Sequence, residues 1–168
     1  MSKKKDQEIL FRQALGNYPT GVTVVTGMNE DGDPIGLTVN SFASVSVDPL
    51  LILWSVDENV STYETFKKID KFAVNILAED QRDVAITFST KEEERFQNSD
   101  WELSEHGLPI LSNVIATLQC ETYETVEVGD HTTLFGKVIG VSASDRAPLL
   151  YHKRNIGPLA KEFHEGKA

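Results

Sequence analysis

Residues 35–47 have the sequence IGLTVNSFASVSV, whose polarity alternates with a period of two. Such alternation is typical of a β-strand that turns one face toward a core. One face is apolar apart from Ser41, and consists of Ile35, Leu37, Val39, Ala43, Val45 and Val47. The opposite face carries no charge and consists of Thr38, Asn40, Phe42, Ser44 and Ser46. It could be a solvent face, but solvent faces usually include Lys or Glu, so we favour a strand that faces a ligand.

Strand signals also dominate on both sides of this stretch. The β-branched residues of segment 22–28 lead into the turn-forming segment 29–34, which predicts a hairpin. The run that follows the Asp48-Pro49 break, residues 50–56, is apolar apart from Ser55 and is suited to a buried strand. Further strands are predicted at residues 72–77, 114–128 and 132–141, the last two joined around the Gly-Asp-His turn at 129–131.

Helices are fewer than strands. One is predicted to end near Leu15, one to run from the capping-box residue Ser61 to about Lys68, and one to run from an Asp80 cap to Phe88. The polar segment 89–105 is predicted to be a loop or lid anchored by Phe96 and Trp101, and the apolar segment 148–152 is expected to dock. Because no regular βαβ alternation occurs, we expect a mainly β fold, a barrel with a few covering helices.

Length and charge narrow the function classes. The 168 residues fit one domain, 1–168, in which residues 1–5 are expected to be a disordered tail. The net charge of -10 disfavours binding to nucleic acid or to anionic lipid. The one cysteine, Cys120, forms no intrachain disulfide, and no apolar stretch approaches membrane-spanning length, so we expect a cytoplasmic protein.

Motifs for the commonest enzyme chemistries are missing from the sequence. None of the four histidines shows paired metal-ligand spacing, so we expect no metal, and there is no G-x-S-x-G elbow, Walker loop or G-x-G-x-x-G turn. Ser61 and Thr62, at the start of a predicted helix, could hold a phosphate with their hydroxyls and the free backbone N–H groups. Taken alone, these residues favour the simpler interpretation that Ser61 caps the helix.

From residue 11 to residue 151, the chain resembles the short-chain flavin reductases, the reductase components of two-component flavin-dependent monooxygenases. The matching segments are FRQALGNYPTGVTVVT at 11–26, GLTVNSFASVSVDP at 36–49, FAVNIL at 72–77, Arg95-Phe96, and Gly-Asp-His at 129–131. The resemblance implies a six-stranded antiparallel Greek-key split barrel and an FMN site at the interface of a homodimer. It also implies hydride transfer from NADH or NADPH to FMN, with FAD as a possible substitute, and delivery of reduced flavin to a separate monooxygenase component.

The resemblance also assigns site residues. The flavin ring and ribityl chain would pass Thr38, Val39, Asn40 and Ser41, while Ser55, Ser61 and Thr62 match positions that hold the ribityl and phosphate groups. Lys91 would add a positive charge near the phosphate. Because Ser41 falls on the apolar face of residues 35–47, its contact requires backbone atoms or a bulge. The segment 59–63 departs from the usual run of serines, which leaves the phosphate contacts open.

His131 matches the family histidine beside the nicotinamide, and we expect it to position the nicotinamide cofactor rather than to transfer a proton. Tyr151 and His152 match a C-terminal region that approaches the same site. Without the resemblance, His131 would be interpreted as an exposed turn residue. An alternative function is a flavin-binding protein of the same fold without nicotinamide-dependent activity, serving as a flavin carrier or electron relay. The sequence does not distinguish NADH from NADPH.

Overall fold

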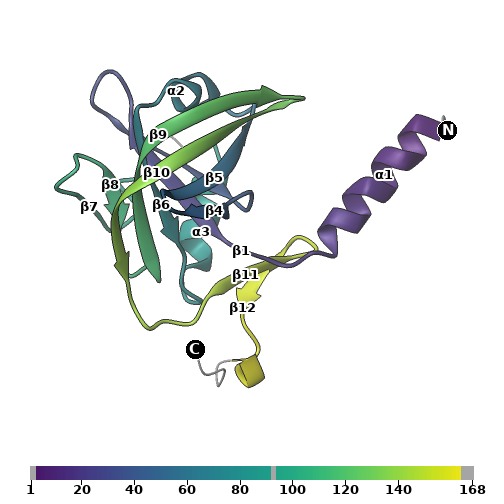
Figure 1. The fold of residues 1–168 in the computed structure, drawn as a ribbon. Coiled ribbons are helices and arrows are strands. Elements are labelled where there is room, and N and C mark those ends of the chain that lie inside the picture. The colour runs from purple at the N-terminus through teal and green to yellow at the C-terminus, as the bar shows by residue number, and fades with distance from the viewer. Residues whose placement is uncertain (1–2, 92–93, 164–168) are drawn as a thin grey trace.

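The computed structural model describes residues 3–91 and 94–163 and is mainly β (Figure 1). Its elements in chain order are α1 (Lys3–Gly16), β1 (Thr20–Gly21), β2 (Thr23–Met28), β3 (Pro34–Val39), β4 (Ala43–Val47), β5 (Leu50–Asp57), α2 (Tyr63–Lys67), β6 (Lys71–Ile76), α3 (Arg82–Ser89), β7 (Trp101–Leu103), β8 (Pro109–Leu111), β9 (Ala116–Val128), β10 (His131–Ala143), β11 (Leu149–His152), β12 (Asn155–Pro158) and a 3-10 turn (Lys161–Phe163). No helix in these two ranges is long and apolar enough to cross a membrane.

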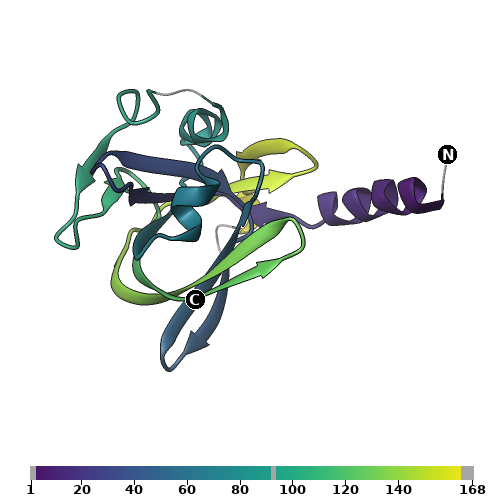
Figure 2. The same ribbon diagram turned by 90° about the horizontal axis from the view of Figure 1, so that it is seen from above.

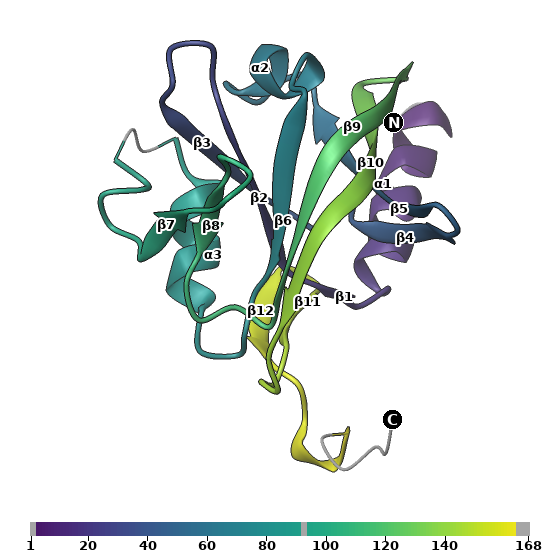
Figure 3. The same cartoon turned by 60° about the vertical axis from the view of Figure 1, so that its left-hand side comes forward.

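The main sheet forms the barrel, and its two edge strands are consecutive in the chain. It has seven antiparallel strands in the order β3-β2-β6-β9-β10-β5-β4, which Figure 3 shows side by side. Its two edges, β3 and β4, are separated in the chain by residues 40–42 only. Counted as the two halves of one bent strand, they give the six-stranded barrel that the family resemblance implied. The crossing from β5 to β6, which are not neighbours in the sheet, makes the Greek-key connection.

The prediction of one continuous strand over residues 35–47 was wrong. At residues 40–42 the strand breaks, and the Ser41 hydroxyl takes the place of a backbone partner for β5. Its Oγ donates to the carbonyl oxygen of Ser55 and accepts from the Ser55 N–H, both at 2.9 Å. Beyond the break the predicted apolar face turns outward, so that Val45 is 45% exposed and Val47 is 85% exposed.

Two clusters form the core. Inside the barrel, Trp54 meets the edges of Phe66 and Phe72, with ring centroids 5.1 and 5.8 Å apart. Under α3, Phe88, Phe96 and Trp101 pack edge to face, which confirms that Phe96 and Trp101 anchor the polar segment. Residues 50–56 were predicted to be wholly buried, but β5 buries alternate side chains only and turns the others to the outside of the barrel.

The predicted helices exist, but their starts differ from the predictions. α1 ends at Gly16, next to the expected end at Leu15, and begins at Lys3, so the structure describes residues 3–5 of the expected disordered tail as helical; residues 1 and 2 lie outside the described ranges. Thr62 rather than Ser61 is the N-cap of α2, and Gln81 rather than Asp80 is the N-cap of α3; neither makes a side-chain capping bond.

The ends of the chain add a small sheet beside the barrel. β11, which contains most of the apolar segment 148–152, pairs with both β1 and β12, so the predicted docking is confirmed. β7 and β8 form a two-stranded ribbon, which places a strand inside the segment predicted to be a loop. As Figure 2 shows from above, α1 extends away from the barrel; the helix has no buried residue.

Candidate functional site

The outer face of β5 and β10 brings together residues that lie far apart in the sequence. In the antiparallel pair, Ser55 lies opposite Thr133 and Asp57 opposite His131. The residues between them in β5 and β10 are buried in the barrel, so these four side chains point outward. Ser55 and His131 therefore share one face of the sheet, although 76 positions separate them in the chain.

A chain of hydroxyls runs across this face. The Ser41 hydroxyl bonds the backbone of Ser55, and Ser55 Oγ lies 2.8 Å from Thr133 Oγ1. We call Ser41, Ser55 and Thr133 the hydroxyl strip. All three residues are partly exposed and none is charged, so the strip offers donors and acceptors to a ligand without electrostatic repulsion.

His131 begins β10 beside the hydroxyl strip, with its side chain 42% exposed. Its Nδ1 lies 2.7 Å from Oδ1 of Asp130. The hydrogen bond from His131 is the largest of the causes that lower the pKa of Asp130. Across the strand pair, the pKa of Asp57 is also lowered, chiefly because its Oδ1 accepts hydrogen bonds from the backbone and side-chain N–H groups of Asn59, both at 2.8 Å.

The segment after β5 is tied to the β9–β10 turn and ends at a buried hydroxyl. The Glu58 N–H donates to the carbonyl oxygen of Asp130 at 3.1 Å. Tyr63 fixes the start of α2 through a 2.8 Å hydrogen bond between its hydroxyl and Thr132 Oγ1. The Thr62 hydroxyl is buried and has no hydrogen-bond partner among residues 3–91 and 94–163, whereas Ser61 is exposed. A buried hydroxyl without a partner costs stability, so Thr62 Oγ1 is suited to meet a group from a ligand.

The other predicted flavin residues lie on the β3 side of the strand break. Thr38 Oγ1 donates to the carbonyl oxygen of Ala85 in α3 at 2.7 Å, Val39 packs against the core, and Asn40 is exposed. Lys91 is exposed two residues after α3 ends. Among the described residues, no hydrogen bond or ion pair joins Thr38 or Lys91 to the hydroxyl strip.

A cleft away from the hydroxyl strip has the wrong charge for a phosphorylated ligand. It has a volume of about 670 Å³ and is lined by the β2–β3 turn, α2 and residues 106–108. Its four carboxylates outnumber its two lysines: Glu30, Asp31, Glu64 and Asp70 against Lys68 and Lys71. A second cleft of about 460 Å³ surrounds the ion pair of Asp80 and Arg146. Neither includes the hydroxyl strip, so the chemistry of the side chains, not the depth of the cleft, identifies the site.

The sequence did not identify every residue of this face. Thr133 and Asp57 enter it only through the pairing of β5 with β10, a long-range register that no local pattern encodes. Elsewhere, the interpretation of Cys120 as a buried strand thiol is confirmed, and burial raises its pKa to about 12. Within residues 3–91 and 94–163, no group of three or more His, Cys, Asp or Glu side chains could hold a metal ion.

Comparison with known proteins gives a family. Residues 15–160 match the family model described as the flavin reductase like domain. The FMN reductase (NADH) SmoA of Agrobacterium fabrum is 39% identical over 152 residues, which cover 90% of this chain and 86% of SmoA. The reductase component of the flavin-dependent trigonelline monooxygenase of Acinetobacter baylyi is 44% identical over 85% of this chain. The match covers 46% of that relative, so the chain spans about half of its length.

Solved structures give the same likeness in three dimensions. The NADH:FAD oxidoreductase SgcE6 of Streptomyces globisporus, solved in complex with NAD and FAD fragments, superposes with a TM-score of 0.88. It is 32% identical, and the match covers 96% of this chain and 98% of that one. The flavin reductase PheA2 in its native state has a TM-score of 0.84 at 34% identity, with 96% of this chain and all of that chain covered.

Proposed function

Because the chain belongs to the flavin reductase like domain family, we propose that it is an NAD(P)H-dependent flavin reductase that hands reduced flavin to a separate monooxygenase component. The observation that carries the proposal is the uncharged hydroxyl strip next to a partly exposed His131 on one face of the barrel. The relatives support the choice of substrates, since one is named an FMN reductase that uses NADH and another an NADH:FAD oxidoreductase.

The described side chains fit a flavin nucleotide. The unpartnered hydroxyl of Thr62 is a ready donor for a phosphate oxygen, and the hydroxyl strip offers partners for a polyhydroxyl chain. The residues that we propose for flavin binding are Thr38, Val39, Asn40, Ser41, Ser55, Ser61, Thr62 and Lys91. Bound FMN or FAD supplies the hydride acceptor, and the protein contributes geometry and exclusion of water.

His131 is proposed to position the nicotinamide. Hydride transfer between stacked rings needs no protein nucleophile, so a histidine at the edge of the site acts by orienting the cofactor. Replacement of His131 by Ala is expected to raise the KM for the nicotinamide and to leave FMN affinity unchanged. Unaltered kinetics would make His131 an ordinary turn residue.

Thr62 gives the sharpest test of flavin binding. A Thr62→Val substitution keeps the shape of the side chain and removes a buried hydroxyl that has no partner, so the protein is expected to fold at least as stably. Loss of a hydrogen bond to a charged phosphate is expected to raise the FMN Kd about 10- to 100-fold. Fluorescence titration with FMN measures it, and Thr65→Val on the same helix is the matched control.

The decisive experiment for the activity itself is simple. Oxidation of NADH and of NADPH is followed by absorbance with FMN, with FAD and without flavin. Rapid flavin-dependent oxidation supports the reductase, and the rate ratios identify both preferred cofactors. Flavin binding without oxidation of either nicotinamide would instead support the carrier or relay alternative.

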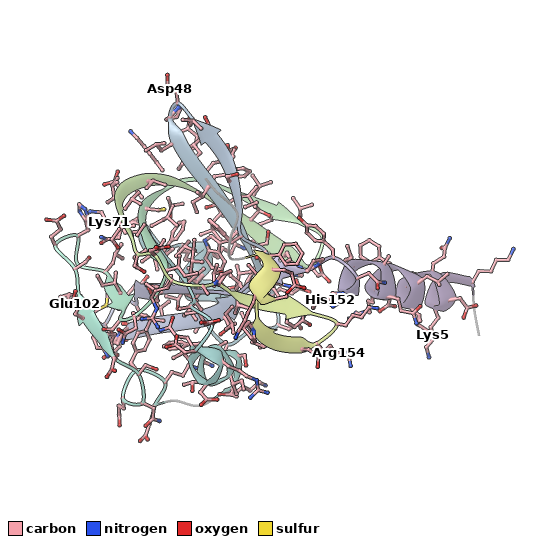
Figure 4. The ribbon with its side chains drawn as sticks, turned by 90° about the horizontal axis from the view of Figure 1, so that it is seen from below. Lys5, Asp48, Lys71, Glu102, His152 and Arg154 are labelled. Carbon is pink, nitrogen blue, oxygen red and sulfur yellow. The ribbon has the colours of Figure 1, made fainter. Side chains whose placement is uncertain are left out.

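We also propose that the active form is a homodimer. α1 presents apolar side chains to solvent, with Ile9, Leu10, Phe11 and Leu15 each more than 40% exposed. A 14-residue helix that buries none of its side chains is marginal in water, so a partner is needed to stabilise it. The β4–β5 hairpin, whose tip carries Asp48, projects from the barrel in another direction and exposes Val47 (Figure 4). A second copy would cover both projections and the open face beside the hydroxyl strip.

Light scattering after gel filtration tests the dimer. The parent is expected at twice the chain mass of 18.7 kDa, and Phe11→Glu is expected to shift it toward the monomer. Gln13→Glu adds the same charge to the same exposed helix and should leave the dimer intact.

We further propose a cytoplasmic location, which the free, buried thiol of Cys120 supports because reduced thiols are usual in that compartment.

A further inference from the structure

We propose that Asp130 is a positioning residue, which holds His131 in the tautomer that carries its proton on Nδ1 and presents Nε2 as a hydrogen-bond acceptor. The inference rests on the proposed function, in which His131 meets the nicotinamide, and it adds a direction to that contact. His131 would accept a hydrogen bond from the substrate instead of donating one.

The hydrogen bond at Nδ1 of His131 determines which ring nitrogen carries the proton. Nδ1 of His131 and Oδ1 of Asp130 are 2.7 Å apart, which is a short hydrogen bond. An ionised carboxylate is an acceptor only, so the ring nitrogen must be the donor. The lowered pKa of Asp130 keeps that carboxylate ionised at neutral pH. In a neutral imidazole only one nitrogen carries hydrogen, and Nε2 is therefore left as the acceptor.

The turn holds Asp130 in place from its backbone side. The carbonyl oxygen of Asp130 accepts the N–H of Glu58, which follows β5. The preceding Gly129 has a φ of 63°, a conformation that glycine adopts without strain. The backbone of Asp130 is thus tied to the segment after β5, although its side chain is 76% exposed. Its effect is on the orientation and tautomer of a neighbouring ring, which an exposed hydrogen bond can control even when it adds little stability.

The second carboxylate near His131 belongs to Asp57 and is hydrogen-bonded to Asn59. Asp57 faces His131 from β5, but its Oδ1 is bound by both N–H groups of Asn59. From β9, the residue opposite His131 is the apolar Val128. Asp57 therefore acts on the ring through its field only, whereas Asp130 bonds it directly. This difference supplies a control with the same charge change and the same location.

An Nε2 acceptor would discriminate between nicotinamide and analogues that lack its amide N–H groups. The carboxamide of nicotinamide carries two N–H donors, and an Nε2 acceptor can bind one of them. A 3-acetylpyridine analogue has a ketone in place of the amide and no such donor, so it gains nothing from this contact. A fixed Nε2 acceptor therefore favours the amide, because a site built for a donor rejects an analogue that lacks it.

Nitrogen NMR of histidine-labelled protein without flavin tests the tautomer directly. At a pH where the imidazole is neutral, the parent and Asp57→Asn are expected to show protonated Nδ1 at His131. Asp130→Asn can donate to Nδ1 and is expected to move the proton to Nε2, while Asp130→Glu should retain the parental pattern. A parent that carries its proton on Nε2, or the same change in Asp57→Asn, would overturn the proposal.

Kinetics test the consequence with the flavin-saturated enzyme. Asp130→Asn is expected to raise the KM for the reduced nicotinamide about tenfold, with little change in kcat, in FMN Kd or in the KM for the reduced 3-acetylpyridine analogue. Equal increases in both KM values would refute the Nε2 contact. If the parent oxidises no nicotinamide, the proposed function fails, and the NMR result still decides the role of Asp130 in fixing the ring.

Discussion

Replacement of Asn75 by Ala tests how the barrel tolerates a polar side chain in the middle of an apolar strand. Asn75 is fully buried in β6. Its Nδ2 donates to the carbonyl oxygen of Val24 at 3.0 Å and to Thr26 Oγ1 at 3.1 Å. Its Oδ1 accepts from the Leu111 N–H at 3.0 Å and from Thr117 Oγ1 at 3.4 Å. One side chain thus links β6 to β2, β8 and β9.

The magnitude follows from the groups that lose their partner. In Asn75→Ala, the buried N–H of Leu111 has no acceptor, and an orphaned buried donor costs about 1–3 kcal/mol. The lost bonds from Nδ2 and the small cavity bring the expected loss to about 3 kcal/mol. For a chain of this size, that corresponds to a fall in Tm of about 6–12 °C.

Thermal unfolding at one fixed protein concentration, without flavin, measures the change. Asn155→Ala is the matched control, because this exposed asparagine makes one 3.3 Å hydrogen bond at the sheet edge and should shift the Tm by less than about 2 °C. An Asn75→Ala protein that unfolds within about 2 °C of the parent would refute the reasoning, since the four bonds would then contribute nothing net.

Three further variants test other parts of the fold. Gly136→Ala places a Cβ 2.5 Å from a core phenylalanine ring and should cost about 1–3 kcal/mol in denaturant unfolding, whereas Gly21→Ala, with no atom within 4 Å, should not. Lys153→Asn combined with Arg154→Gly relieves two positive φ angles at the β11–β12 turn and should raise the Tm by about 2–6 °C. Asp80→Asn should lower the Tm at pH 7 but not near pH 2. The pKa of Asp80 is depressed below 3.8 by its arginine partner, so its contribution is present above that value and is lost as the pH falls.

The sequence predicted what local patterns can encode. The hairpin of β2 and β3, the two long strands β9 and β10, and the ends of α1 and α3 all follow from residue alternation and turn residues. Even the anchors Phe96 and Trp101 stand out as apolar residues in a polar segment. None of these predictions required knowledge of which strands become neighbours.

Predictions failed where a distant part of the chain competes for a side chain. Asp80 has the right position to cap α3, but its carboxylate binds Arg146 at 2.6 and 2.8 Å instead. The expected capping box at Ser61 is likewise unformed, and α2 is positioned by the bond from Tyr63 to Thr132. In both places a tertiary contact replaces the local hydrogen bond that the sequence pattern favours.

The hydroxyl strip shows why a defect in a pattern can mark a site. Ser41 was the one polar residue on the apolar face of residues 35–47, and the strand breaks there because its hydroxyl satisfies the backbone of Ser55. The break lets one strand serve both edges of the sheet and starts the strip that we propose for the flavin. It also turns Val45 and Val47 outward while Leu37 stays against the core. The barrel covers only the part of this apolar face before the bend, and the exposure of the part after it is consistent with the homodimer that we propose.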